Sequence, residues 1–139
     1  MNIYQISVFI ENKPGRLTEV VDVLAKNNID IRALSIADTT DFGILRLIVS
    51  DPEKAIEVLR ADGITVTKTR VIGVALADEP GALSKVLAIL NNAGIALEYA
   101  YAFITHSKSN ACVVLRVEDN DAAIKVLSEN GVSFVDGIE

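Results

Sequence analysis

A turn that contains Pro-Gly occurs twice in this sequence, as IENKPGRL at residues 10–17 and as LADEPGAL at residues 76–83. A shift of 66 residues aligns Gly15 with Gly81 and also superimposes apolar positions, including Leu24 on Leu90. Farther along, the shift becomes 68 residues, because two residues are added near the segment THSKSN at 105–110. A repeat this long predicts a duplicated small domain, since solenoids have shorter periods.

Each copy has the pattern strand, helix, strand, strand, helix, strand. In the first copy we expect strands at 2–10, 29–37, 44–50 and 64–69, with a turn at TTDFG. Leu17, Val20, Val21 and Leu24 have the spacing of an amphipathic helix. Asp51 and Pro52 predict the N-cap and first position of a second helix, which Gly63 ends. The second copy follows the same course to Ile138.

The boundary between the copies falls near Thr69 and contains no linker. The segment TVTKTRVIGVALAD passes directly from the last strand of one copy to the first strand of the next. We therefore expect domains at 1–69 and 70–139. The predicted fold class is α+β, a ferredoxin-like βαββαβ unit duplicated in tandem, with antiparallel sheets and helices on one face.

The composition excludes several classes of function. Half of the 139 residues are hydrophobic, and the net charge is −6, so a basic nucleic-acid-binding face is not expected. The sequence lacks a signal peptide and a long apolar run, which predicts a cytoplasmic protein without a membrane partner. One Cys, predicted to be a buried inert thiol, and one His in a loop provide too few ligands for a zinc site, so no metal or cofactor is expected.

The repeated turn has a chemistry of its own. Proline stiffens the entry to the helix, and glycine tolerates unusual φ angles and close approach of a ligand to the main chain. The first turn of a helix also has backbone N–H groups without partners at the positive end of the dipole. Such a place favours a carboxylate or a phosphate. Alternatively, Pro-Gly only connects a strand to a helix, but its occurrence in both copies favours a binding role.

With ENKPGRL followed by NNIDI, and DEPGAL followed by NAGIAL, the sequence resembles the ACT domain family over nearly its whole length. ACT domains are small amino-acid-sensing regulatory modules. The resemblance implies that the copies pair and that a free amino acid binds at the interface between them. The ligand would lie against the turn of one copy and the start of the second strand of its neighbour.

The resemblance also implies which positions would form these sites. In serine-sensing members, asparagines two residues before Pro-Gly and at the start of the second strand hold the ligand. The first copy would contribute Asn12, Lys13, Pro14, Gly15, Arg16, Leu17, Asp30 and Ile31. The second copy would contribute Asp78, Pro80, Gly81, Ala82, Leu83 and Ala96.

The two sites are not equivalent in this sequence. At the first asparagine position, the first copy has Asn12 and the second copy has Asp78. At the second asparagine position, the first copy has Asp30 and the second copy has Ala96, which has no polar side chain. Two carboxylates near each other would favour an ammonium group between them, although plain surface acids remain the alternative. Lys13 and Arg16 could strengthen anion binding or only solvate the loop. Tyr99, Tyr101 and Phe103 alternate along one strand and either pack under the helices or line a pocket.

Three functions are compatible with this pattern. The first is a stand-alone amino-acid-binding regulatory protein, expected to be a homodimer, which acts on an enzyme or transporter in trans. The second is the regulatory small subunit of an amino-acid biosynthetic enzyme similar to acetolactate synthase. The segment IENKPGRL resembles the start of such small subunits. The third is a small enzyme, which the ferredoxin-like fold can host. No combination of base and nucleophile favours the third, so we expect a non-enzyme.

Overall fold

A computed structural model describes residues 3–38, 41–104 and 110–135. The chain divides into two compact units, one built mainly from Tyr4–Thr69 and the other from Arg70 onward together with Ile3. The first unit contains β1 (Ile3–Glu11), α1 (Arg16–Lys26), β2 (Ile31–Asp38), β3 (Phe42–Val49), α2 (Pro52–Ala61) and the start of β4 (Thr65–Ala77). The second unit contains the rest of β4, α3 (Ala82–Asn92), β5 (Leu97–Ala102), β6 (Asn110–Val117), α4 (Asn120–Glu129) and β7 (Ser133–Phe134).

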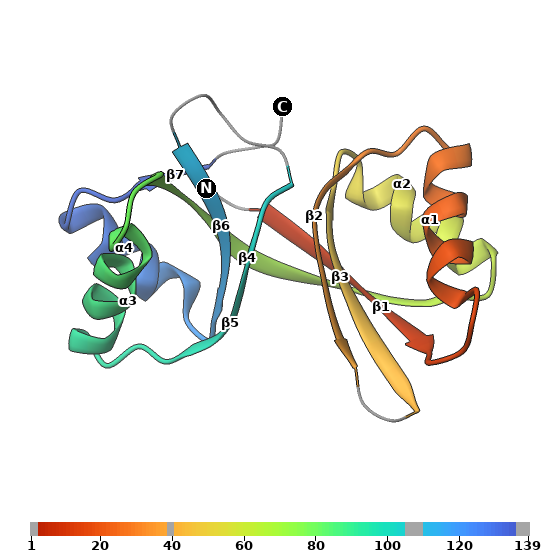
Figure 1. Ribbon diagram of the computed structural model, residues 1–139, viewed down its shortest axis with the longest axis horizontal. Helices are drawn as coiled ribbons and strands as arrows, with labels where there is room; N and C mark the ends of the chain where they lie inside the picture. The colour runs from red at the N-terminus through yellow and green to blue at the C-terminus, as the bar shows by residue number, and fades with distance from the viewer. Residues whose placement is uncertain (1–2, 39–40, 105–109, 136–139) are drawn as a thin grey trace. The chain divides into compact units, whose positions relative to one another are not determined.

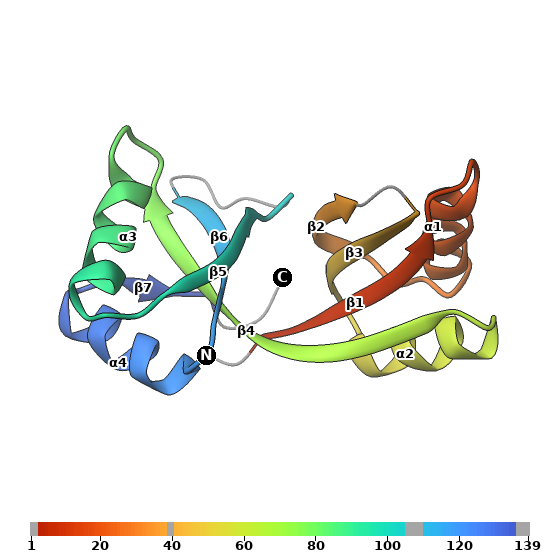
Figure 2. The same ribbon diagram turned by 90° about the horizontal axis from the view of Figure 1, so that it is seen from below.

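The strand order is the same in the two units. In the first it is β2-β3-β1-β4, and in the second the corresponding order is β5-β6-β4-β7. The pairs β1/β3, β2/β3, β4/β6, β5/β6 and β4/β7 are antiparallel. Within each unit the two helices lie along the same face of the strands (Figures 1 and 2). These arrangements confirm the ferredoxin-like fold class.

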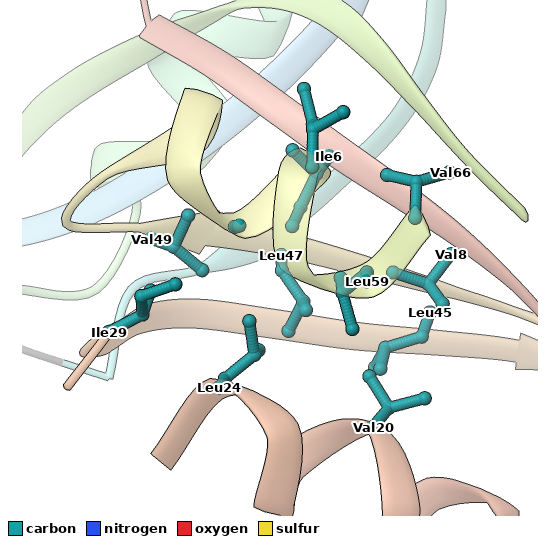
Figure 3. Close-up of a cluster of buried hydrophobic side chains, with 12 residues drawn as sticks. Ile6, Val8, Val20, Leu24, Ile29, Leu45, Leu47, Val49, Leu59 and Val66 are labelled. Carbon is teal, nitrogen blue, oxygen red and sulfur yellow. The ribbon is translucent and has the colours of Figure 1, made fainter. Parts of the chain in front are cut away.

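Each unit has its own hydrophobic core between helices and strands. In the first unit, alternate residues of the strands, including Ile6, Val8, Leu45 and Leu47, point toward α1 and α2 (Figure 3). In α1, Val20 and Leu24 are buried, whereas Leu17 and Val21 are 37% and 36% exposed. The apolar face of α1 is therefore wider than the part that the core covers. In the second unit, Val86, Leu90, Leu115 and Leu127 occupy the corresponding core.

The structure corrects several predicted boundaries. The segment TTDFG is not all turn, because Phe42 and Gly43 extend β3 by pairing with Glu11 and Ile10 of β1. The final strand β7 has only two residues, Ser133 and Phe134. The junction near Thr69, where the sequence predicted no linker, lies within one uninterrupted strand, β4, of 13 residues from Thr65 to Ala77. The lengthened turn at 105–109, with His106, and the predicted end at Ile138 lie outside the described residues.

The second helix of each unit begins with the expected aspartate cap. Asp51 Oδ1 accepts a hydrogen bond from the Lys54 backbone N–H at 3.1 Å, and Asp119 Oδ1 accepts one from Ala122 N–H at 3.1 Å. Pro52 follows Asp51 at the start of α2. These bonds satisfy N–H groups that the helix itself leaves without acceptors.

Replacing either cap, as Asp51→Ala or Asp119→Ala, should lower the free energy of unfolding by about 1 kcal/mol, because one N–H loses its acceptor. Chemical denaturation would measure this loss. Asp51→Asn and Asp119→Asn keep an accepting oxygen and should remain close to the parent. Equal stability of the alanine and asparagine variants would show that the caps contribute nothing.

Candidate ligand-binding site

The turn between β1 and α1 has the glycine conformation that its sequence suggests. Gly15 has φ 86° and occupies the left-handed region at the N-cap of α1. The turn is closed by a backbone bond from Arg16 N–H to Lys13 O at 3.3 Å, and Glu19 N–H donates to Gly15 O at 3.0 Å. A Cβ added to Gly15 would meet nothing within 4 Å. Glycine is therefore required here by backbone conformation and not by crowding.

The second Pro-Gly turn has the same geometry. Gly81 has φ 89°, Ala82 N–H donates to Glu79 O at 3.4 Å, and Lys85 N–H donates to Gly81 O at 3.1 Å. Space beside Gly81 is also open. The two copies therefore repeat a backbone conformation as well as a sequence motif.

The helices that follow these turns begin without a side-chain cap. Neither Gly15 nor Gly81 has a side chain to accept a hydrogen bond, in contrast to the aspartates before α2 and α4. The N–H groups of Leu17 and Thr18 in α1, and of Leu83 and Ser84 in α3, lie in first turns where no earlier helical carbonyl can accept them. The dipole places partial positive charge at the same point. The arrangement can bind a carboxylate.

The basic residues of the first turn are partly neutralised by neighbouring acids. Lys13 Nζ lies 2.7 Å from Glu11 Oε2, while the Arg16 guanidinium lies 3.3 Å from Glu11 Oε1 and 3.1 Å from Glu19 Oε2. The hydrogen bond from Lys13, together with the charges of Lys13 and Arg16, lowers the pKa of Glu11 below its usual value. The second turn has Glu79 and Ala82 at the positions of Lys13 and Arg16. The charge around the two turns therefore differs.

The predicted residues at the start of β2 are positioned by the neighbouring strand end. Asp30 N–H donates to Ser50 Oγ at 3.0 Å, and Ser50 N–H donates to Asp30 O at 2.9 Å. The Asp30 side chain is 67% exposed and lies beside Arg32, a residue that the sequence did not single out. Ile31 packs against the core, and Ala96, which corresponds to Asp30 in the second unit, is exposed.

The turn and the start of β2 do not meet within one unit. They lie at opposite ends of α1, whose 11 residues span about 16 Å at 1.5 Å per residue. An amino acid is much shorter than this helix. A ligand that contacts both elements therefore requires the turn of one copy and the strand of another. Asn12 and Asp78, like the other residues of 12–15 and 78–81, are exposed, whereas Arg16 and Ala82 are half-buried.

Each unit also contains a cavity at the matching end of its first helix. The cavity in the first unit has a volume of about 260 Å³ and is lined in part by Glu11, Arg16 and Glu19. The cavity in the second unit has a volume of about 400 Å³ and is lined in part by Ala82 and Lys85. Of the predicted site residues, only Arg16 and Ala82 line these cavities. The cavities are thus beside the turns and distinct from most of the predicted contacts.

The remaining chemistry of the described residues is limited. Tyr99 and Tyr101 stack with ring centroids 6.4 Å apart, which confirms that they share a face of β5. Cys112 is half-buried rather than fully buried, and burial raises the pKa of its thiol, which lowers its reactivity.

Across residues 3–38, 41–104 and 110–135, no group of three or more His, Cys, Asp or Glu side chains could hold a metal ion. None of the described helices is long and apolar enough to span a membrane.

Comparison with known families and structures agrees with this architecture. A sequence model of the ACT domain pair matches residues 1–139. The chain is similar to a protein from Bacteroides thetaiotaomicron of known crystal structure, with 47% identity, a TM-score of 0.91, and coverage of 97% of this chain and 92% of that one. None of the curated proteins compared with the chain matches it.

Two more distant structures share the fold. The ligand-free regulatory subunit of aspartate kinase from Thermus thermophilus is 18% identical with a TM-score of 0.64, and the match covers 92% of this chain and 91% of that one. Aspartate kinase from Synechocystis is 21% identical with a TM-score of 0.62, over 98% of this chain and 26% of that one. At these identities the likeness concerns architecture alone.

Proposed function

Because this chain belongs to the ACT domain pair family, we propose that it is a stand-alone regulatory protein that binds a free amino acid at the interface between ACT units. Binding would change the pairing of the units and so regulate an enzyme or transporter of amino-acid metabolism in trans. The family is regulatory and not catalytic, which supports a role without an enzymatic reaction.

One observation carries the proposal. The two helices that follow Pro-Gly begin at left-handed glycines without side-chain caps, whereas the other two helices are capped by Asp51 and Asp119. Side-chain caps are therefore present at the starts of α2 and α4, which do not follow the repeated turn. At the repeated turns it keeps first-turn N–H groups available for an external acceptor, and the α-carboxylate of an amino acid is suited to this position.

The position of the second contact supports binding between copies. Asp30 is exposed and its carboxylate can accept hydrogen bonds from an α-ammonium group, but it lies at the far end of α1 from the turn of its own unit. A neighbouring copy would have to provide the turn. The edge strands β2 and β5 provide unpaired backbone groups through which copies could associate, so we propose a homodimer.

Thermal unfolding of the full chain against each common L-amino acid, added singly at millimolar concentration, tests the proposal. An amino acid at 100 times its dissociation constant should stabilise the native state by about 2.7 kcal/mol, which raises the melting temperature. A shift for one amino acid or one chemical group of them is expected. The absence of any shift would overturn the sensor role, and a stable complex with a catalytic chain in a pull-down would then favour the regulatory-subunit alternative.

A further inference from the structure

The second strand of each unit contains an irregularity at the same place. In the first unit, the register between β2 and β3 shifts between Ile31 and Ala33, which makes Arg32 the bulged residue. In the second unit, the register between β5 and β6 shifts between Leu97 and Tyr99, at Glu98. Arg32 and Glu98 are related by the same 66-residue shift as the two glycines. A β-bulge changes the direction of the side chain at the bulged residue. Both copies therefore have a charged side chain whose direction is set by a bulge at the equivalent position.

The two bulged residues differ in sign and in surroundings. Glu98 has a counterion on the adjacent strand, because its Oε2 lies 3.2 Å from Nε of Arg116. The 68-residue shift places Arg116 on Ile48, a residue of β3 that pairs with Ala33 of β2 and is 1% exposed. The first unit therefore has an apolar residue where the second has a counterion. The adjacent strand provides a charge partner for Glu98, but Ile48 cannot provide one for Arg32.

Arg32 is also poorly satisfied for a charged residue in a partly buried place. Its side chain is only 15% exposed, and Nε and Nη1 are buried without a hydrogen-bond partner in the part of the chain that the structure describes. Asp30 Oδ2 lies 2.8 Å from Nε, an ion-pair distance without hydrogen-bond geometry. Two buried guanidinium nitrogens without hydrogen bonds are costly even beside a carboxylate, so they need a specific explanation.

We propose that Arg32 binds the α-carboxylate of the amino acid, while Asp30 accepts a hydrogen bond from its α-ammonium group; this inference rests on the function proposed above. An ammonium and a carboxylate on one carbon match an acid and a guanidinium held side by side. The planar guanidinium suits a carboxylate, which would accept hydrogen bonds from its N–H groups once the site opens. Asp30, being 67% exposed, can move aside to admit it. The helix N-terminus of a neighbouring copy can contact the same carboxylate.

The inference assigns a specificity to the start of β2. Ligands would need both an α-carboxylate and an α-ammonium group. The second unit would not form this contact, because its bulge carries a carboxylate that Arg116 already pairs and because Ala96 stands where Asp30 does. Only the first copy's strand would therefore take part, which gives the two copies different roles.

Isothermal titration calorimetry on the full chain tests this assignment, with the common L-amino acids as probes. Arg32→Met should weaken binding of an amino acid at least about tenfold, because a charge-assisted bond is lost. Glu98→Gln alters the matched bulge of the second copy. Its dissociation constant should stay within about twofold of the parent's, well below the tenfold change expected for Arg32→Met. The parent should prefer the amino acid to its α-carboxamide, and Arg32→Met should lose most of that preference.

Thermal unfolding without ligand gives an independent readout. If Arg32 is held for a ligand, removing its buried nitrogens that lack hydrogen bonds should leave the melting temperature unchanged or higher, since stability is commonly sacrificed at binding sites. A lower melting temperature for Arg32→Met, with unchanged affinity for the amino acid, would make Arg32 a structural residue and overturn the inference alone. Failure of the parent to bind any amino acid would instead overturn the proposed function and this inference together.

Discussion

Leu24→Ala is expected to lower the free energy of unfolding of the first unit by about 2–5 kcal/mol, the largest stability loss that we predict. Leu24 is fully buried on α1 and points toward the strands, with Leu47 nearby in the same cluster (Figure 3). Removing three carbons there leaves a cavity that a packed core fills only in part. Denaturant unfolding, followed by circular dichroism, would measure the change.

The same helix provides a matched control. Leu17→Ala removes the same atoms from a residue that is 37% exposed, so it should cost clearly less than Leu24→Ala. Leu90, which is 1% exposed at the corresponding position of α3, should behave like Leu24 when replaced by alanine. Equal effects for Leu17 and Leu24 would contradict the assignment of Leu24 to the core.

Gly15→Val is expected to have the largest effect on ligand binding while leaving a folded protein. A β-branched residue at φ 86° should cost about 1–3 kcal/mol of stability, because left-handed backbone is strained for such a residue. The strain would shift the turn and misplace the first-turn N–H groups of α1. Titration calorimetry with the amino acid found in the thermal screen should show a loss of binding.

Two variants separate strain from binding. Gly94→Val introduces the same residue at φ 73°, also in open space, but after α3 and at a position that lines neither cavity. It should lose similar stability and keep its affinity. Gly15→Asn tolerates left-handed backbone and should lose less stability than Gly15→Val. If Gly15→Val remains folded and binds the amino acid as tightly as the parent, the turn is not part of the site.

The fold was predictable because the sequence contains its pattern twice. An ambiguous short segment in one copy, such as Leu83–Leu90, could be read by its match to Leu17–Leu24 in the other. Asp51 and Pro52 have local effects on the backbone and predicted the start of α2 correctly. Features with local causes were therefore accessible from the sequence.

Features that depend on pairing partners were not accessible. Phe42 and Gly43 resemble a turn in sequence, yet hydrogen bonding to β1 makes them part of β3. The two-residue length of β7 likewise depends on its pairing with β4, where Phe134 pairs with Val74 and Ser133 with Ala75. Exposure of Leu17 depends on how α1 is rotated on the sheet, which a periodic pattern does not specify.

The candidate site was predicted in part. Both glycines were selected from the sequence, and their left-handed conformations agree with the reason for selecting them. Arg32, which we propose as a further contact, was not selected from the sequence, because a β-bulge is a relation between two strands and has no signature in one of them. The opposite charges of Arg32 and Glu98 at equivalent positions were the one available signal.

The most direct test of amino-acid binding at the repeated turn is a ¹⁵N–¹H NMR titration of the full chain with the amino acid that stabilises it. Binding at the turn should give the largest shifts at the backbone N–H signals of Leu17 and Thr18, or of Leu83 and Ser84, with weak effects at the capped starts of α2 and α4. Saturable shifts confined to other residues, with those four amides unmoved, would contradict it.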